Sequence, residues 1–171
     1  MPRILGFPPV AGPNSRVMIL GSMPGAASLA AGEYYAHPRN AFWPVLGRLL
    51  EMDPAAPYAD RIQVLLREGL AVWDVLKSCK REGSLDSSIQ AGSLMVNDFS
   101  AFLRGYPLVR NICFNGTTAE TLFRKRVAQG LGPMLEGVGL FRLPSTSPAH
   151  ASLSLARKTE MWRGVLTPLL A

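Results

Sequence analysis

Short continuous runs of apolar residues alternate along this chain with apolar residues spaced three or four positions apart. A short apolar run predicts a buried β-strand, and the wider spacing predicts a helix with one apolar face. The runs that predict strands are 16–20, 70–73, 109–114 and 139–143. The spacings that predict helices cover 40–50, 58–66, 98–103, 119–127 and 155–170.

Strand followed by helix, repeated along the chain, predicts parallel strands joined by right-handed crossovers. We therefore expect an α/β fold, a three-layer α/β/α domain with a central four-stranded parallel sheet. No linker, repeat or low-complexity stretch interrupts the 171 residues, so one domain, 1–171, is expected. In such sheets ligands bind beyond the carboxyl ends of the strands. The segments that follow the strands, and hold the candidate site, are 21–40, 74–79, 115–116 and 144–150.

Local signals refine three of these elements. Asn40 stands where the N-cap of the first long helix is expected, and Pro44 suits the first turn of that helix. Residues Thr117–Glu120 have the capping-box pattern before another helix. The polar, turn-rich stretch Lys77–Gly92 predicts a long loop.

Charge and cysteine content narrow the functional classes. Eighteen Lys and Arg against twelve Asp and Glu give a net charge of +6, which permits a polyanionic partner without requiring one. Cys79 and Cys113 are expected to be buried thiols. With two cysteines and two histidines, neither an iron–sulfur cluster nor a zinc site is expected, and we expect no cofactor. No apolar run could span a bilayer and no secretory signal follows Met1, so a cytoplasmic monomer without membrane contact is expected.

The first candidate segment, Gly21–Ser28, consists of small residues after a strand. Small residues allow a ligand to approach the backbone and offer it N–H donors. The segment could equally be a plain strand-to-helix turn. It does not have the spacing of a phosphate-binding P-loop, which also requires Gly-Lys-Ser/Thr.

The second segment, Tyr34–Trp43, is dense in aromatic and polar side chains. An aromatic ring such as Tyr35 can stack on a nucleobase. The Asn40 amide can donate and accept hydrogen bonds at once. The alternatives are a helix cap for Asn40 and a half-buried aromatic for Tyr35, and a structural hydrogen-bonding role is favoured for His37.

The third segment, Leu143–His150, places three hydroxyls between two prolines. Such a loop can hold a phosphate through hydroxyl and backbone N–H groups, and the alternative is an ordinary hydroxyl-rich turn. Asp74 is the one carboxylate predicted at a strand end. It is either a substrate contact or an acceptor that stabilises a loop, and the sequence does not decide between these two interpretations.

Taken together, these segments resemble the uracil-DNA glycosylase superfamily. That family has a four-stranded parallel sheet, one active-site motif after the first strand and a hydroxyl-rich DNA-binding loop after the last. Gly21–Gly25 stands where the first motif belongs, and Ser145–Ala149 where the second belongs. Residues Ala36–Trp43 resemble the His-Pro-x-Asn-x-Phe-Trp stretch of the mismatch-specific branch. The resemblance extends from about Arg3 to the C-terminus and implies a uracil-DNA glycosylase-like fold.

Departures from the motifs indicate one branch of the superfamily. Classical uracil enzymes carry an Asp in the first motif, and mismatch-specific enzymes carry an Asn before the Pro, where this chain has Met23. The usual His of the second motif is replaced by Ser145 and Thr146. The first motif, the Tyr-Tyr-x-His-Pro-Arg-Asn stretch, Trp73–Cys79 and Gly83–Ile89 instead look like the hypoxanthine-DNA glycosylase branch.

The resemblance implies a monofunctional DNA glycosylase of base excision repair. It would hydrolyse the glycosidic bond of a deaminated base, hypoxanthine above all, flipped out of double- or single-stranded DNA. Asn40 is the implied catalytic residue, and catalysis would act mainly on the leaving base. The implied base-binding residues are Gly21, Ser22, Met23, Pro24, Tyr35, Asp74 and Asn115. The implied phosphate-holding and wedge residues are Ser145, Thr146, Ser147, Ala149 and His150.

Three rival functions remain open on the sequence. One is a uracil or mismatch glycosylase of the same superfamily. Another is a DNA- or nucleotide-binding module that has lost the chemistry, which Met23 makes credible. The third is a serine hydrolase built on Ser22 and His150, although Gly21–Gly25 lacks the Gly-x-Ser-x-Gly spacing of a nucleophile elbow.

Overall fold

The computed structural model describes all 171 residues and contains a four-stranded sheet of order β3-β2-β6-β7. Its strands are β2 (Val17–Gly21), β3 (Leu70–Asp74), β6 (Asn111–Asn115) and β7 (Gly139–Leu143). All three pairings are parallel. The predicted sheet is therefore confirmed, with strands beginning at 17, 70, 111 and 139 where 16, 70, 109 and 139 were expected.

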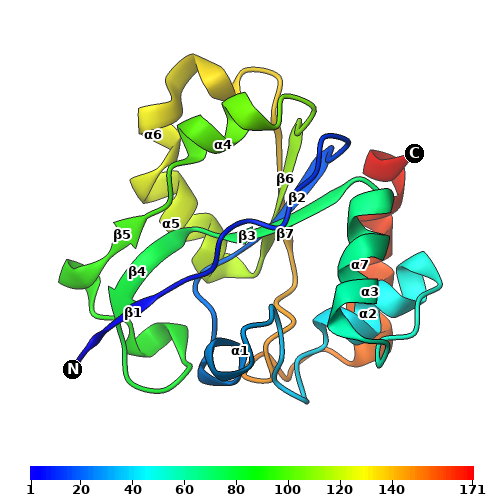
Figure 1. The fold of residues 1–171 in the computed structure, drawn as a ribbon, viewed down its shortest axis with the longest axis horizontal. Helices are drawn as coiled ribbons and strands as arrows, with labels where there is room; N and C mark the ends of the chain where they lie inside the picture. The colour runs from blue at the N-terminus through cyan, green and yellow to red at the C-terminus, as the bar shows by residue number, and fades with distance from the viewer.

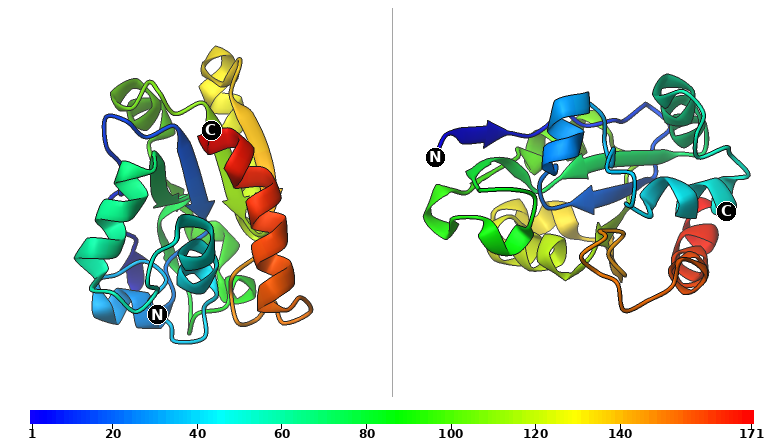
Figure 2. Two further views of the ribbon diagram at one scale, coloured as in Figure 1. Left: turned by 90° about the vertical axis from the view of Figure 1, so that its right-hand side faces the viewer. Right: turned by 90° about the horizontal axis from the view of Figure 1, so that it is seen from below.

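Helices cover both faces of this sheet, as the three-layer prediction requires (Figures 1 and 2). In β2, Met18 and Leu20 join one buried cluster, whereas Val17 and Ile19 join another. This alternation follows from the two-residue period of a strand. The first cluster is covered by α4 (Phe99–Gly105), α5 (Thr117–Arg126) and α6 (Ala128–Leu131). The second is covered by α2 (Phe42–Leu50), α3 (Tyr58–Arg67) and α7 (Leu155–Leu170).

A second, antiparallel sheet lies beside the first and was not predicted (Figure 1). Its order is β1-β4-β5, with β1 (Arg3–Leu5), β4 (Leu76–Lys80) and β5 (Met95–Val96). The predicted loop over 77–92 is therefore wrong in its first part, because β4 occupies it. The remainder holds two short 3₁₀ turns, η1 (Asp86–Ser88) and η2 (Ala91–Ser93). The strands β1 and β5 have only three and two residues, too few to show a period. The five residues of β4 include Lys77, Ser78 and Lys80 and do not form an apolar run.

The predicted capping box at Thr117–Glu120 is also wrong. Helix α5 begins at Thr117 with Gly116 as its N-cap and no side-chain capping bond. Gly116 has a positive φ of 96°, and a Cβ there would lie 2.9 Å from the Cβ of Ser145. Because the 144–150 loop lies so close, the N-cap position of α5 has room only for glycine and not for a residue with a capping hydroxyl.

The remaining elements complete the fold. They are α1 (Ala26–Ala31), which follows the first candidate segment, and η3 (Gly132–Leu135) before β7. Both cysteines are free and buried, as expected. No helix combines the length and apolar character that a membrane span requires.

Candidate active site

A cavity of about 660 Å³ opens at the carboxyl end of the parallel sheet. Its lining includes residues of α1 and of the loops after β2 and β7, segments that gather at the bottom of Figure 1. The structure brings together there all thirteen residues that the sequence singled out. They are Gly21, Ser22, Met23, Pro24, Tyr35, Asn40, Asp74, Asn115, Ser145, Thr146, Ser147, Ala149 and His150.

The first segment offers the cavity its backbone. The carbonyls of Gly21 and Ser22 accept hydrogen bonds from the amides of Val75 (2.8 Å) and Leu76 (3.0 Å), which fasten the segment to the end of β3. The amides of Ser22 and Met23 donate to no group of the protein. The Met23 side chain is 7% exposed and packs in the core. Met23 therefore contributes its main chain, not its side chain, to polar contacts.

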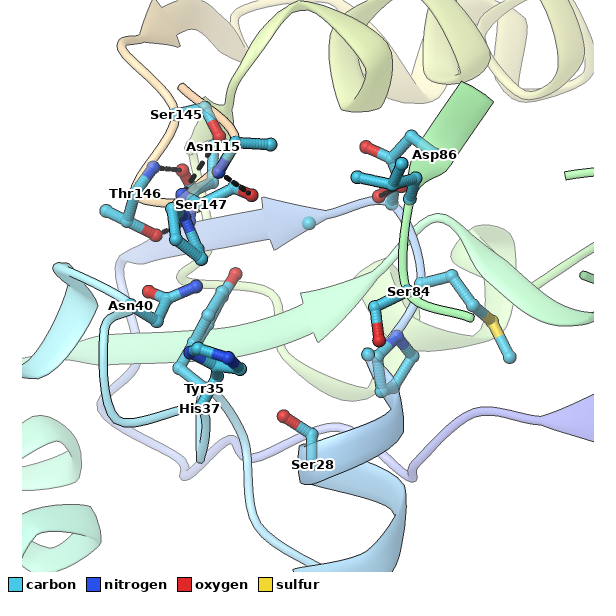
Figure 3. A pocket seen from close by; sticks show the side chains of 18 of the residues that line it. Ser28, Tyr35, His37, Asn40, Ser84, Asp86, Asn115, Ser145, Thr146 and Ser147 are labelled. Atoms are coloured by element: carbon cyan, nitrogen blue, oxygen red, sulfur yellow. Dashed lines mark hydrogen bonds between the residues drawn. The ribbon is translucent and has the colours of Figure 1, made fainter. Parts of the chain in front are cut away.

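Tyr35 forms an aromatic wall of the cavity (Figure 3). Its ring stacks on Phe42 with centroids 3.9 Å apart and an interplanar angle of 17°. Its neighbour Tyr34 anchors the loop, because the Tyr34 hydroxyl donates to the carbonyl of Pro8 and its carbonyl accepts from Trp43 Nε1. Tyr35 also has a positive φ of 56°. The ring is thus held in place before any ligand arrives.

The predicted N-cap role of Asn40 is wrong by one residue, because Ala41 is the N-cap of α2 and has no side-chain capping bond. Asn40 Oδ1 accepts a hydrogen bond from the Phe42 amide at 3.0 Å, at the start of α2. This bond fixes the amide orientation and leaves Nδ2 without a partner in the protein, beside Tyr35 in Figure 3. The free group in the cavity is therefore a hydrogen-bond donor. His37 Nδ1 accepts from the Arg39 amide, in agreement with the structural role favoured for it.

Thr146 anchors the third segment to the rest of the protein and does not offer its hydroxyl to a ligand. Thr146 is 1% exposed. Its amide donates to Asn115 Oδ1 and its Oγ1 accepts from Asn115 Nδ2, both at 2.9 Å. Its carbonyl accepts from the Ala41 amide, which joins the third loop to the second. The Asn115 side chain and the amide and hydroxyl of Thr146 are therefore hydrogen-bonded to each other. Ser145 and Ser147 remain at the surface of the cavity.

We expect Asn115→Ala to lower the free energy of unfolding by about 1–3 kcal/mol, because the buried Thr146 amide loses its acceptor. Thr146→Val removes only the hydroxyl bond and should cost less. Chemical denaturation of both variants measures the difference, with the exposed Thr117→Ala as a control. An Asn115→Ala midpoint equal to that of the wild type would contradict this assignment.

Asp74 is the buried carboxylate of the cavity, with 4% of the residue exposed. Burial, and then the negative charge of Asp86, raise the pKa of Asp74 to about 7, while Arg81 acts in the opposite direction. Asp86 itself accepts a hydrogen bond from Ser22 Oγ at 2.7 Å. Its own pKa is also raised, chiefly by desolvation.

The segment after β4 supplies site residues for which the sequence predicted no role. Residues Ser84–Ser87 line the cavity, and Ser84 and Asp86 lie across it from Tyr35 and Asn40 (Figure 3). Ser84 Oγ accepts from the Ala26 amide at 2.8 Å. Arg81, only 5% exposed, donates to the carbonyls of Pro24 and Gly83 and so ties this segment to the first one. The available signal was its run of small polar residues, which resembles the other site loops.

Unpaired buried polar atoms concentrate in the cavity. Only four buried side-chain nitrogen or oxygen atoms of the protein have no hydrogen-bond partner. Three of them, the Tyr35 hydroxyl, Asp74 Oδ2 and His150 Nε2, belong to cavity residues. Buried polar atoms are normally paired. The cavity is therefore shaped for a ligand with a flat face and a polar edge.

Two other kinds of site find no support. Ser22 Oγ donates to Asp86 and not to a histidine, so the serine-hydrolase arrangement is not formed. No group of three or more His, Cys, Asp or Glu side chains is placed to hold a metal ion.

Comparison with known proteins gives a consistent result. The model of the uracil DNA glycosylase superfamily matches residues 8–166. The hypoxanthine DNA glycosylase of Methanosarcina acetivorans is 37% identical over 163 residues, covering 94% of this chain and 96% of that protein. The hypoxanthine DNA glycosylase of Methanosarcina barkeri is 39% identical over 112 residues, which cover 65% of this chain and 70% of that protein. The solution structure of a putative uracil DNA glycosylase from M. acetivorans superimposes with a TM-score of 0.78 at 34% identity, covering 99% of both chains.

Proposed function

The chain belongs to the uracil DNA glycosylase superfamily, and we propose that it removes hypoxanthine from DNA. It would hydrolyse the N-glycosidic bond of a nucleotide flipped into the cavity and leave an abasic site. The observation that carries this proposal is the set of three unpaired buried polar atoms, one each on Tyr35, Asp74 and His150, in residues that line one cavity. The two relatives named hypoxanthine DNA glycosylase support the choice of base.

The flipped base would stack on Tyr35. Phe42 supports the far side of that ring, so the stacking surface does not have to be ordered on binding. Stacking of this kind is worth about 1–3 kcal/mol per base in nucleic-acid-binding proteins. Asn40 Nδ2 and the amides of Ser22 and Met23 would donate hydrogen bonds to the acceptor atoms of the base.

Catalysis would act on the departing base. The glycosidic bond breaks through a sugar with oxocarbenium character, so an enzyme can stabilise either the sugar cation or the negative charge that develops on the base. The first motif carries no acidic side chain for the sugar or the water. The donor Nδ2 of Asn40, held by the bond from Phe42 to Oδ1, can stabilise the base instead.

The DNA backbone would lie across the third segment. Ser145 and Ser147 would hold phosphates beside the flipped nucleotide, and Ala149 and His150 would take its place in the stack. Lys158 Nζ donates to the carbonyl of His150 at 2.7 Å and steadies this wedge from α7. No lysine lines the cavity, so a Schiff-base step lacks a nucleophile and a monofunctional enzyme is proposed. We propose that the enzyme acts as a cytoplasmic monomer, and the free, buried Cys79 and Cys113 are compatible with a reducing compartment.

A panel of labelled oligonucleotides carrying hypoxanthine, uracil, xanthine or a thymine mismatch tests the proposal. We expect fastest release of hypoxanthine, seen as strand breaks only after alkali, and no adduct trapped by borohydride. Faster release of uracil or mismatched thymine would instead support a uracil or mismatch glycosylase of the same superfamily. Binding without release of any base would identify a module that has lost the chemistry.

A further inference from the structure

The buried carboxyl group of Asp74 stands in the cavity without the contacts that would stabilise its anion. No backbone or side-chain N–H donates to either of its oxygens, and it forms no ion pair. The carboxylate of Asp86 differs, since it receives the Ser22 hydroxyl. A buried carboxyl group without donors or a paired cation favours its neutral, protonated form.

The charged and titratable groups around Asp74 strengthen this tendency. Asp86, on the segment after β4, adds a negative charge that raises the pKa of Asp74. The pKa values of Tyr34 and Tyr35, on the loop after α1, are raised by burial and by Asp74, so both hydroxyls are neutral and add no charge. Arg81 is the only cation that acts on Asp74, and its guanidinium donates to two carbonyls. In agreement, the pKa of Asp74 is raised to about 7, so the acid is populated at neutral pH.

The position of this carboxyl group places it beside the stacked base. A Cβ built on Gly21 would collide with Asp74 Oδ1 and lie 2.9 Å from the Tyr35 hydroxyl. Asp74 and the stacking ring of Tyr35 therefore converge on one point of the backbone. A base stacked on that ring presents an edge toward Asp74.

We infer that Asp74 is the general acid of the reaction and that its Oδ2 protonates the imidazole nitrogen N7 of the departing hypoxanthine. This inference rests on the proposed function. As the C1′–N9 bond breaks, its electron pair moves into the purine ring, and the proton from Asp74 lets the base leave neutral. Water then adds to C1′, and the proton that this water loses returns to the Asp74 carboxylate. Uracil has no imidazole ring, so this step favours a purine.

Single-turnover rates of hypoxanthine release between about pH 5 and pH 9 test the inference. For the wild type we expect a level rate at low pH that falls roughly tenfold per pH unit above about pH 7, as the acid is lost. Asp74→Asn should be roughly 10²–10⁴-fold slower at pH 6 and should lack this descending limb.

Asp86→Asn supplies a second readout that a purely structural role would not move. Its Oδ1 can still accept from Ser22, but the negative charge that raises the pKa of Asp74 is removed. The descending limb should therefore shift to lower pH while remaining present. Thermal melting of both variants reports on folding, and the shift in Asp86→Asn decides the matter if Asp74→Asn fails to fold.

The outcomes separate this inference from the proposed function. If the wild type releases no hypoxanthine, the proposed function fails. If the wild type releases hypoxanthine while folded Asp74→Asn keeps the rate and the pH profile, only the general-acid role is overturned. If the descending limb of the pH–rate profile of Asp86→Asn lies at the same pH as that of the wild type, the general-acid role is also overturned.

Discussion

Replacing Asn40 with aspartate is expected to lower the single-turnover rate of base release roughly a hundredfold or more, with little change in stability. Aspartate keeps an oxygen that can accept from the Phe42 amide, so the start of α2 is preserved. In place of Nδ2, however, it puts an acceptor with negative charge where the base needs a donor. Removal of one preorganised donor of this type typically costs about 2.7–4 kcal/mol of barrier stabilisation.

Asn40→Ala separates the two roles of the side chain. It removes the donor together with the oxygen that accepts from the Phe42 amide, so it should lose the same activity and in addition about 0.5–1.5 kcal/mol of stability. Rates under single-turnover conditions and denaturation curves, measured on both variants, provide the comparison. Equal rates for Asn40→Asp and the wild type would remove Asn40 from the chemistry and leave it only the structural bond to the Phe42 amide.

The four parallel strands could be predicted because each contains a short apolar run whose pattern is local, although only β2 and β3 are buried throughout and β7 is mostly half-buried. The helix α7, Leu155–Leu170, was predicted for the same reason, since its apolar positions repeat over sixteen residues. The strand β4 escaped prediction because it is held by partners far away in the chain, with Arg3 opposite Lys80. Local periodicity carries no information about such pairings.

The candidate site likewise has features that the sequence predicts and features that it does not. Strand ends of a parallel sheet meet at one edge, so the convergence of the loops that hold Gly21, Asn115 and Ser145 follows from topology alone. The orientation of the Asn115 amide toward Thr146 depends on a contact across 31 positions. The buried guanidinium of Arg81 likewise depends on Pro24, 57 positions away. Contacts of this kind become visible only in three dimensions.

Gly21→Ala is expected to reduce base release by roughly a hundredfold or more, since displacing preorganised groups by about 1 Å has effects of that size. Gly21 ends β2, where its backbone pairs with Asp74. The new Cβ would collide with Asp74 Oδ1 and lie 2.9 Å from the Tyr35 hydroxyl, which is closer than real Cβ contacts allow. Both side chains must then move, and they are the proposed acid and the stacking surface.

Gly21→Ala should reduce the rate of base release more than it reduces the stability of the fold. Overpacking typically costs about 1–3 kcal/mol, and here part of the strain can be relieved into the cavity, because Tyr35 and Asp74 both line it. Gly105→Ala is the matched control, since a Cβ there meets nothing within 4 Å. Melting curves and single-turnover rates of both variants check the prediction. A Gly21→Ala enzyme with wild-type rates would show that neither Asp74 nor Tyr35 has to keep its position for base release.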